Sequence, residues 1–304
     1  MFQHLIDRGL VKGKSYPNGL TVYKYSRQVF YDALWNEDPL LLEARGMVLD
    51  ADGNKVIWPF TKVFNYNENM TTLGPDTIVV APRKVNGFMA ACRMYKGELI
   101  VSTTGTLDSE YAAMARKHIE ALSAPYYVRD YAEDFTLLFE ICDTSDPHIV
   151  EEDAGAYLIG ARYMQEDGYN VYGQMCTESC LDGMASAIGA KRPALFYGSF
   201  RQVLDLLVDC KHEGYMVRLA TPEQPTVMKL KSPHYLTKKF IMRMGKGKVE
   251  YMFNHKEEFL KNTDEEFYPV VHHITRWFTI ESWQARDDVA RRAIIEDFFE
   301  NTQR

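Results

Sequence analysis

Short segments rich in β-branched, aromatic and aliphatic residues dominate the first 235 residues of the chain. Turn-forming dipeptides such as Asn18-Gly19, Asp52-Gly53 and Lys96-Gly97 separate several of them, which is typical of strands joined by tight turns. Because these segments do not alternate regularly with helices, the pattern predicts an α+β fold with mostly antiparallel sheet. The expected strands are Leu20–Tyr25, Gly46–Asp50, Lys55–Trp58, Thr77–Ala81, Phe88–Tyr95, Leu99–Thr103, Thr136–Ile141, Tyr157–Tyr163, Tyr215–Leu219 and Thr226–Leu230.

Helical spacing of apolar residues appears in two places. Within the mixed region it predicts helices over Ser109–Ser123, Thr177–Ile188 and Phe200–Lys211. From about Thr237 onward the strand pattern stops, and an apolar stripe of Ile274, Trp277 and Phe278 is expected on one helix. We therefore expect two domains, a mixed domain over residues 1–236 and a small all-helical domain over residues 237–304. The helices expected in the second domain are Lys256–Lys261, Asp264–Ile280 and Arg286–Asn301.

Composition and charge narrow the class of protein. The 304 residues are 46% hydrophobic and 25% charged, which excludes a disordered chain. No apolar run is long enough to span a membrane, and five scattered cysteines without a C-x-x-C pair favour a reducing cytoplasm. The net charge is −7, yet Lys229–Lys248 carries six lysines, one arginine and no acid. Such a basic stretch attracts phosphates, although a solvated basic surface would look the same.

One apparent phosphate-binding motif fails on inspection. Gly9, Gly13, Lys14 and Ser15 resemble a phosphate loop, but the two glycines are one residue too close. A turn at Pro17-Asn18-Gly19 follows instead of the helix whose N-terminus completes such a site. We therefore expect no phosphate loop there.

Charged residues recur at strand positions where apolar residues would be the default. Lys84 precedes Gly87 at a strand end, Glu140 lies inside an apolar strand, and Glu213-Gly214 precedes another strand. Lys229 and Lys231 share one face of a strand because their spacing is two residues. A lysine can act as a covalent nucleophile, acids can hold a divalent ion, and lysines can hold phosphates. Taken singly, each residue is equally compatible with an ordinary turn or ion pair.

As an ordered set, K-x-x-G, strand glutamate, E-G and K-x-K resemble the covalent nucleotidyltransferase superfamily. The intervals of 56, 73 and 16 residues between Lys84, Glu140, Glu213 and Lys229 suit ligases and capping enzymes. Two upstream segments resemble those of ATP-dependent RNA ligases of the T-even phage single-strand type. These segments are Glu43–Asp50, containing Arg45-Gly46, and Pro59–Glu68, containing Lys62. The likeness extends over about residues 40–235 and implies a nucleotidyltransferase (adenylyltransferase) domain over residues 1–236.

The resemblance implies an RNA ligase that joins 5′-phosphate and 3′-hydroxyl RNA ends through lysyl-AMP and adenylylated RNA. Lys84 would be the nucleophile, with Glu140, Lys229 and Lys231 as further catalytic residues. ATP is the implied substrate, bound by Arg45, Lys62, Lys84, Gly87, Glu140, Lys229 and Lys231. Mg²⁺ (or Mn²⁺) is the implied cofactor, held by Glu213 and Glu140, with Glu140 alternatively on the ribose hydroxyls.

The partners implied are single-stranded or broken RNA ends, and the implied role is RNA repair. We expect a monomer without membrane contact, in the cytoplasm of a host bacterium if the source is a bacteriophage. Two departures from the family pattern are Asn86, where aspartate is frequent, and Thr104, where a basic residue is usual. Alternatives are a DNA ligase, a capping enzyme, a catalytically inactive nucleotide- or RNA-binding module, and an unrelated acidic interaction protein. No β-barrel pattern follows Lys231, which argues against the first two.

Overall fold

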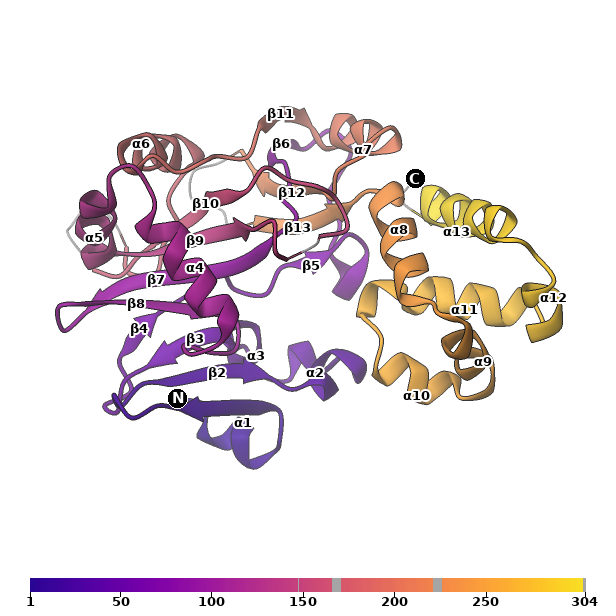
Figure 1. The fold of residues 1–304 in the computed structure, drawn as a ribbon, viewed down its shortest axis with the longest axis horizontal. Helices are drawn as coiled ribbons and strands as arrows, with labels where there is room; N and C mark the ends of the chain where they lie inside the picture. The colour runs from indigo at the N-terminus through magenta and orange to yellow at the C-terminus, as the bar shows by residue number, and fades with distance from the viewer. Residues whose placement is uncertain (147, 166–170, 221–225, 303–304) are drawn as a thin grey trace.

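The structure is a computed structural model that describes residues 1–146, 148–165, 171–220 and 226–302 (Figure 1). Its described strands form three mainly antiparallel sheets, with helices between and beside them, and a helical segment completes the chain. This arrangement confirms the α+β prediction. None of the described helices combines the length and apolar character needed to cross a membrane.

The first sheet has the order β1-β2-β3-β4 and is antiparallel throughout. The helices α1, α2 and α3 accompany it, and Phe2, Leu5, Val29 and Leu41 fill the core beside it. Gly13-Lys14-Ser15 lies within β1, which ends at a turn, so the absence of a phosphate loop is confirmed. The bounds are α1 Gln3–Asp7, β1 Val11–Ser15, β2 Thr21–Tyr25, α2 Arg27–Tyr31, α3 Leu40–Glu43, β3 Arg45–Leu49 and β4 Lys55–Ile57.

The second sheet has the order β10-β9-β7-β8 and contains the main core. One face packs on α4, α5 and α6, while Ala91, Ile100 and Leu138 on the other face pack against the first sheet. The helix α5 was not predicted, because its polar, tyrosine-rich sequence lacks a clear apolar period. The bounds are β7 Phe88–Tyr95, β8 Glu98–Thr103, α4 Glu110–Glu120, α5 Pro125–Asp134, β9 Phe135–Cys142, β10 Gly155–Tyr163 and α6 Glu178–Ile188.

The third sheet has the order β11-β6-β12-β13-β5 and carries α7 on one face. Its one parallel pairing among the described strands joins β13 to β5 at Met228–Phe64 and Lys229–Asn65. This pairing brings the K-x-K strand beside the segment that contains Lys62. The bounds are β5 Phe64–Asn65, β6 Ile78–Pro82, β11 Leu195–Ser199, α7 Phe200–Val208, β12 Gly214–Leu219 and β13 Thr226–Lys231.

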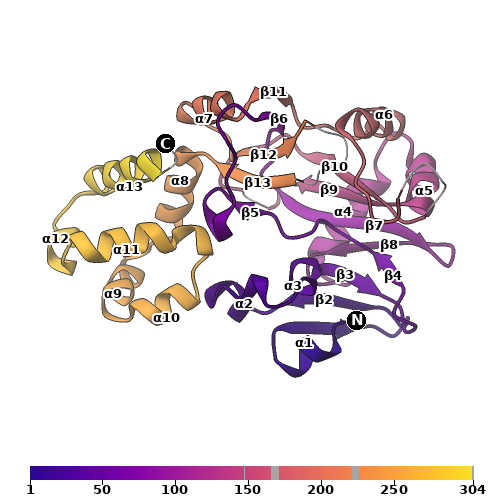
Figure 2. The same cartoon turned by 180° about the vertical axis from the view of Figure 1, so that it is seen from behind.

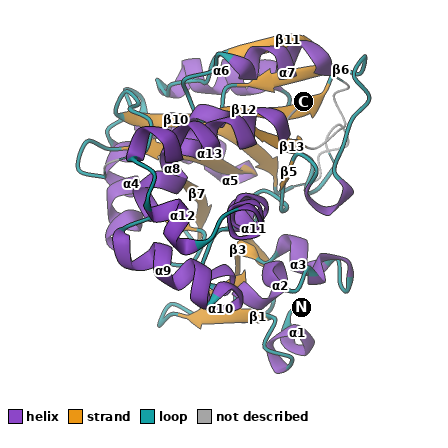
Figure 3. Cartoon of the chain, turned by 90° about the vertical axis from the view of Figure 1, so that its right-hand side faces the viewer, coloured by secondary structure: helices purple, strands orange, loops and turns teal. Residues whose placement is uncertain are grey.

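The helices after β13 gather at one side of the sheets, as Figures 1 and 2 show from opposite faces. They share their own core, which includes Leu236, Phe240, Met252, Phe267 and Ile274. Seen from that side in Figure 3, they lie in front of the sheets. The bounds are α8 Pro233–Arg243, α9 Lys246–Asn254, α10 Lys256–Lys261, α11 Tyr268–Trp277, α12 Ile280–Gln284 and α13 Asp288–Thr302, with a 3₁₀ turn, η3, at Glu265–Phe267.

The expected apolar stripe in this segment is wrong in two of its three positions. Ile274 is buried, but Trp277 is 66% exposed and Phe278 lies beyond the end of α11. The buried face of α11 is made by Val270, Val271 and Ile274 instead. The helix stops earlier than the pattern suggested because Phe278 adopts an extended conformation.

Candidate active site

Lys84 lies in the short connection between β6 and β7 (residues 83–87), here called the Lys84 turn, which backbone contacts fix at both ends. Its amide donates to the Gly214 carbonyl at 2.8 Å, which ties the turn to the start of β12. At the other end, a Cβ on Gly87 would lie 2.3 Å from the Ile141 carbonyl oxygen in β9. Only glycine allows this approach, so the K-x-x-G spacing reflects a steric requirement of the turn.

The Lys84 ammonium group contacts a buried carboxylate. Its Nζ lies 3.0 Å from Oε2 of Glu213, and Asn86 donates to the same oxygen through Nδ2, also at 3.0 Å. Burial opposes the ionisation of Glu213, but the charges of Lys84 and Lys231 outweigh it and lower the pKa of this carboxyl. The side chain of Glu213 is therefore an anion fixed beside the candidate nucleophile.

Glu140 reaches the same turn from the middle of β9. Its Oε1 accepts a hydrogen bond from the Gly87 amide at 3.1 Å. Burial raises the pKa of Glu140, and the neighbouring charge of Glu213 adds to this effect although Lys84 opposes it. Two acids thus converge on one lysine, and their mutual repulsion would be relieved by a bound cation.

A third acid, Glu152, was not predicted from the sequence. Its Oε1 and Oε2 both accept from Nη2 of Arg83 at 2.7 Å, and Oε1 also lies 3.3 Å from the Asn86 amide. Glu152 therefore braces the residues on either side of Lys84. It lies outside any strand pattern, so no local sequence signal marks it.

A cavity of about 320 Å³ opens beside Lys84. Phe60, Val63, Ile159 and Met216 give it apolar walls, and Glu140 lies in its lining. Apolar walls against which a base can pack, together with polar groups that orient the ligand, are a common feature of nucleoside sites. Further lining residues are Arg45, Arg83, Lys84, Gly87, Thr104, Glu178, Arg192, Arg218 and Lys229.

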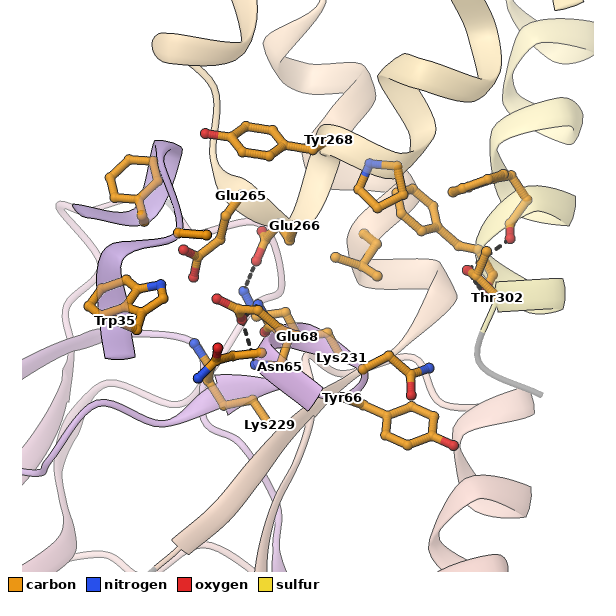
Figure 4. Close-up of a pocket in the computed structure, with 18 residues that line it drawn as sticks. Trp35, Asn65, Tyr66, Glu68, Lys229, Lys231, Glu265, Glu266, Tyr268 and Thr302 are labelled. Atoms are coloured by element: carbon orange, nitrogen blue, oxygen red, sulfur yellow. Dashed lines mark hydrogen bonds and ion pairs between the residues drawn. The ribbon is translucent and has the colours of Figure 1, made fainter. Parts of the chain in front are cut away.

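A second cavity of about 520 Å³ separates the sheets from the helical segment (Figure 4). Lys229 lines both cavities, and Lys231 lines the second. Lys62 lies at the same border, where its Nζ is 2.7 Å from Oε1 of Glu265 and 3.6 Å from Oε1 of Glu68. Lys229 therefore borders both cavities, and the second cavity lies beside a cluster of lysines.

Lys229 is the unpaired member of that cluster among the described residues. Burial lowers the pKa of Lys229 well below its usual range, and the charges of Lys231, Lys62 and Arg45 lower it further. A phosphate group would supply the ion-pair partner that Lys229 does not have among the described residues.

The predicted site residues fall into two groups in space. Arg45, Lys84, Gly87, Glu140 and Lys229 line the first cavity. Glu213 joins them through its contact with Lys84, and Lys231 lies 4.0 Å from Oε1 of Glu213. Lys62 does not line the first cavity. Its Nζ contacts Glu68 and, in the helical segment, Glu265.

Glu265 and Glu266 are, besides Glu152, the residues near the candidate site that were not predicted from the sequence. They belong to η3, outside the expected catalytic domain, but they line the second cavity beside Lys229 and Lys231. The Asp264-Glu265-Glu266 run follows soon after the basic stretch, which is a weak charge-complementarity signal.

The acids fit a divalent cation only in part. Among the described residues, no group of three His, Cys, Asp or Glu side chains is arranged to hold a metal ion. Glu140 and Glu213 offer two carboxylates, and Mg²⁺ commonly takes one or two carboxylates together with substrate phosphates. The pair therefore suits an ion that arrives with a nucleotide.

Solved structures show which class of fold this is. Two forms of an archaeal ATP-dependent RNA ligase match 99% of this chain and 76% of theirs, with TM-scores of 0.62 and 0.61 and identities of 16% and 14%. A protein of Aquifex aeolicus assigned as an ATP-dependent DNA ligase matches with a TM-score of 0.57 and 12% identity, over 99% of this chain and 77% of that one. The fold is thus that of polynucleotide ligases.

The family model for RNA ligase matches residues 43–258, and the chain belongs to this family of enzymes. A search of curated protein sequences returned no match. The matched range includes Arg45, Lys62, Lys84, Glu140 and Glu213, whereas Glu265 and Glu266 lie beyond it.

Proposed function

We propose that this RNA ligase is ATP-dependent and seals 5′-phosphate to 3′-hydroxyl RNA ends through an adenylate on Lys84. The observation that carries the proposal is the contact between Lys84 Nζ and Glu213 at 3.0 Å, at the wall of a nucleoside-sized cavity and close to a lysine cluster. A lysine nucleophile, a slot for the base and cations for the phosphates are the parts that this chemistry needs.

In the first step, the neutral amine of Lys84 attacks the α-phosphorus of ATP. A P–N bond forms while the bond between the α-phosphorus and the α–β bridging oxygen breaks. Pyrophosphate leaves with that oxygen, and the nitrogen releases one proton to solvent. Glu213 orients Nζ before the attack, and Lys229 and Lys231 stabilise the negative charge that develops on the phosphates. Arg45 and Lys62 bind the triphosphate tail.

Glu140 and Glu213 would hold Mg²⁺, or Mn²⁺, together with the phosphates of a bound nucleotide. A divalent ion supplies charge neutralisation at the phosphate oxygens. Glu140 also fixes the Lys84 turn through the Gly87 amide. Because that hydrogen bond uses one carboxylate oxygen, the other remains for a ribose hydroxyl or the ion.

In the later steps, the 5′-phosphate of RNA attacks the adenylate and frees the Lys84 amine. The RNA 3′-hydroxyl then attacks the activated 5′ end, forms the phosphodiester and releases AMP. The stretch Lys229–Lys248 offers cations for the RNA backbone. We further propose RNA repair in the cytoplasm as the role, action as a monomer, and domains over residues 1–236 and 237–304.

A sealing assay tests this function directly. A 5′-phosphorylated RNA oligonucleotide should be joined or circularised with ATP and Mg²⁺, and Lys84→Ala should abolish the product. A DNA oligonucleotide and GTP, run in parallel, separate an RNA ligase from a DNA ligase or a capping enzyme. Absence of any RNA product with well-folded protein would contradict the proposal.

A further inference from the structure

Two adjacent acids of the helical segment lie against the lysines of the candidate phosphate site. Glu265 contacts Lys62 at 2.7 Å, and Glu266 contacts Lys231 and, at 2.5 Å, Lys239. In Figure 4, Glu265 and Glu266 point from the upper edge of the cavity toward Lys229 and Lys231. These contacts join residues more than 25 positions apart and, for Lys62 and Lys231, link the helices to the sheets.

The acids are charged in this arrangement. Burial opposes ionisation of Glu266, but Lys231 and Lys239 outweigh it and place the pKa of this carboxyl well below its usual range. Lys62 and Lys229 likewise outweigh burial at Glu265 and lower its pKa. Glu265 and Glu266 therefore place two negative charges against the cations Lys62, Lys231 and Lys239.

The position of these charges relative to Lys84 is informative. One carboxylate, that of Glu213, contacts Lys84 through Oε2 and lies 4.0 Å from Lys231 through Oε1. Glu266 forms an ion pair with the same lysine, Lys231. If the α-phosphorus of a triphosphate meets Lys84, the nearby cavity lined by Lys229 and Lys231 offers cations for the outer phosphates, and Glu265 and Glu266 line that same cavity.

We propose that Glu265 and Glu266, here called the acid pair, occupy the place of the outer phosphates and compete with the triphosphate tail and with pyrophosphate. The inference rests on the proposed function for the identity of the site. The acid pair neutralises the lysine cluster while the nucleotide is absent, and it must withdraw with its helices before the tail can bind.

This competition sets the apparent affinity. If only a fraction of molecules has the acid pair withdrawn, the dissociation constant for pyrophosphate rises by the inverse of that fraction. The acid pair would thus also favour departure of pyrophosphate after Lys84 is adenylylated, because it refills the vacated lysines. Glu265 and Glu266 lie outside residues 43–258, which match the family model. They would nevertheless control pyrophosphate release from the site within that range.

The test is pyrophosphate binding to unadenylylated enzyme, measured by calorimetry with the full-length chain. Glu265→Gln/Glu266→Gln keeps the side-chain size and removes both charges, and it should bind pyrophosphate about tenfold or more tightly, since hydrogen bonds to charged groups contribute strongly. The matched control is Glu250→Gln/Glu258→Gln, which removes two exposed charges from the same helical segment and should bind as wild type does. Unchanged or weaker binding by the first variant would overturn the proposal.

A second measurement keeps the proposal testable if the variant folds poorly. In the wild-type protein, saturating pyrophosphate should increase hydrogen exchange of amides in residues 264–268, because the acid pair withdraws. Slower or unchanged exchange there, with binding demonstrated, would also overturn it. Labelling by ATP, measured alongside, reports separately on the proposed function, since pyrophosphate binding requires no adenylylation.

Discussion

Replacing Gly87 with alanine tests whether the Lys84 turn depends on its close approach to β9. The new Cβ would lie 2.3 Å from the Ile141 carbonyl oxygen and 2.9 Å from its carbon. Both atoms belong to the backbone of a buried strand, so the turn rather than the strand must move, by about 1 Å. A displacement of that size costs about 1–3 kcal/mol in stability through overpacking.

The same displacement should affect catalysis more than stability. It breaks the 3.1 Å hydrogen bond from the Gly87 amide to Glu140 and shifts Lys84 from Glu213. Misplacement by about 1 Å can slow a reaction by about a hundredfold. We expect the initial rate of Lys84 adenylylation in Gly87→Ala to fall by about that factor, measured with α-labelled ATP at saturating concentration.

Gly183→Ala is the matched control. Gly183 lies in helix α6 with nothing within 4 Å of a new Cβ, so alanine should stabilise the protein by about 0.5–1 kcal/mol and leave labelling unchanged. Denaturant unfolding of both variants gives the stability change. A labelling rate for Gly87→Ala within about threefold of wild type would refute the steric argument.

Two further predictions concern groups with perturbed pKa values. Lys229→Met should raise the free energy of unfolding by about 1 kcal/mol, because burial beside other cations disfavours the charged form of Lys229 and folding of the wild type must overcome that cost, while the variant abolishes labelling. In the wild type, Lys229 is neutral in the native state and protonated in the unfolded state between its lowered pKa and about 10.4, so stability should rise with pH there and less steeply in Lys229→Met. A hydrogen bond with Cys176 lowers the pKa of Cys180 to about 7, and Cys180 should therefore be alkylated by iodoacetamide before the four buried cysteines, with a rate that rises around pH 7. A Cys180 that reacts only above pH 9 would contradict that assignment.

Most of the candidate site residues that the sequence indicated lie on strands or directly beside them. Lys84, Glu140, Glu213 and Lys229 are ordered along the chain as in the family motif. Glu140 and Lys229 lie inside strands, whereas Lys84 and Glu213 lie just before the strands β7 and β12. The α+β architecture followed from strand-like segments that do not alternate with helices. In each case a local pattern reflects a physical requirement, such as the glycine at position 87.

Other parts depend on contacts that no local pattern records. Glu152 and Glu265 come from irregular segments and meet their partners across 69 and 203 residues. The buried face of α11 was misassigned because Phe278 leaves the helix, which places Trp277 in solvent. Tertiary packing decides such positions, and apolar spacing alone does not.

The most direct test of the account is to locate the adenylate. The protein is incubated with ATP and Mg²⁺, digested, and its peptides are examined by mass spectrometry for added AMP. The account predicts an acid-labile AMP on the peptide that contains Lys84, absent from Lys84→Ala. No adenylated peptide, from protein shown to be free of AMP beforehand, or an adenylate on a different lysine, would contradict it.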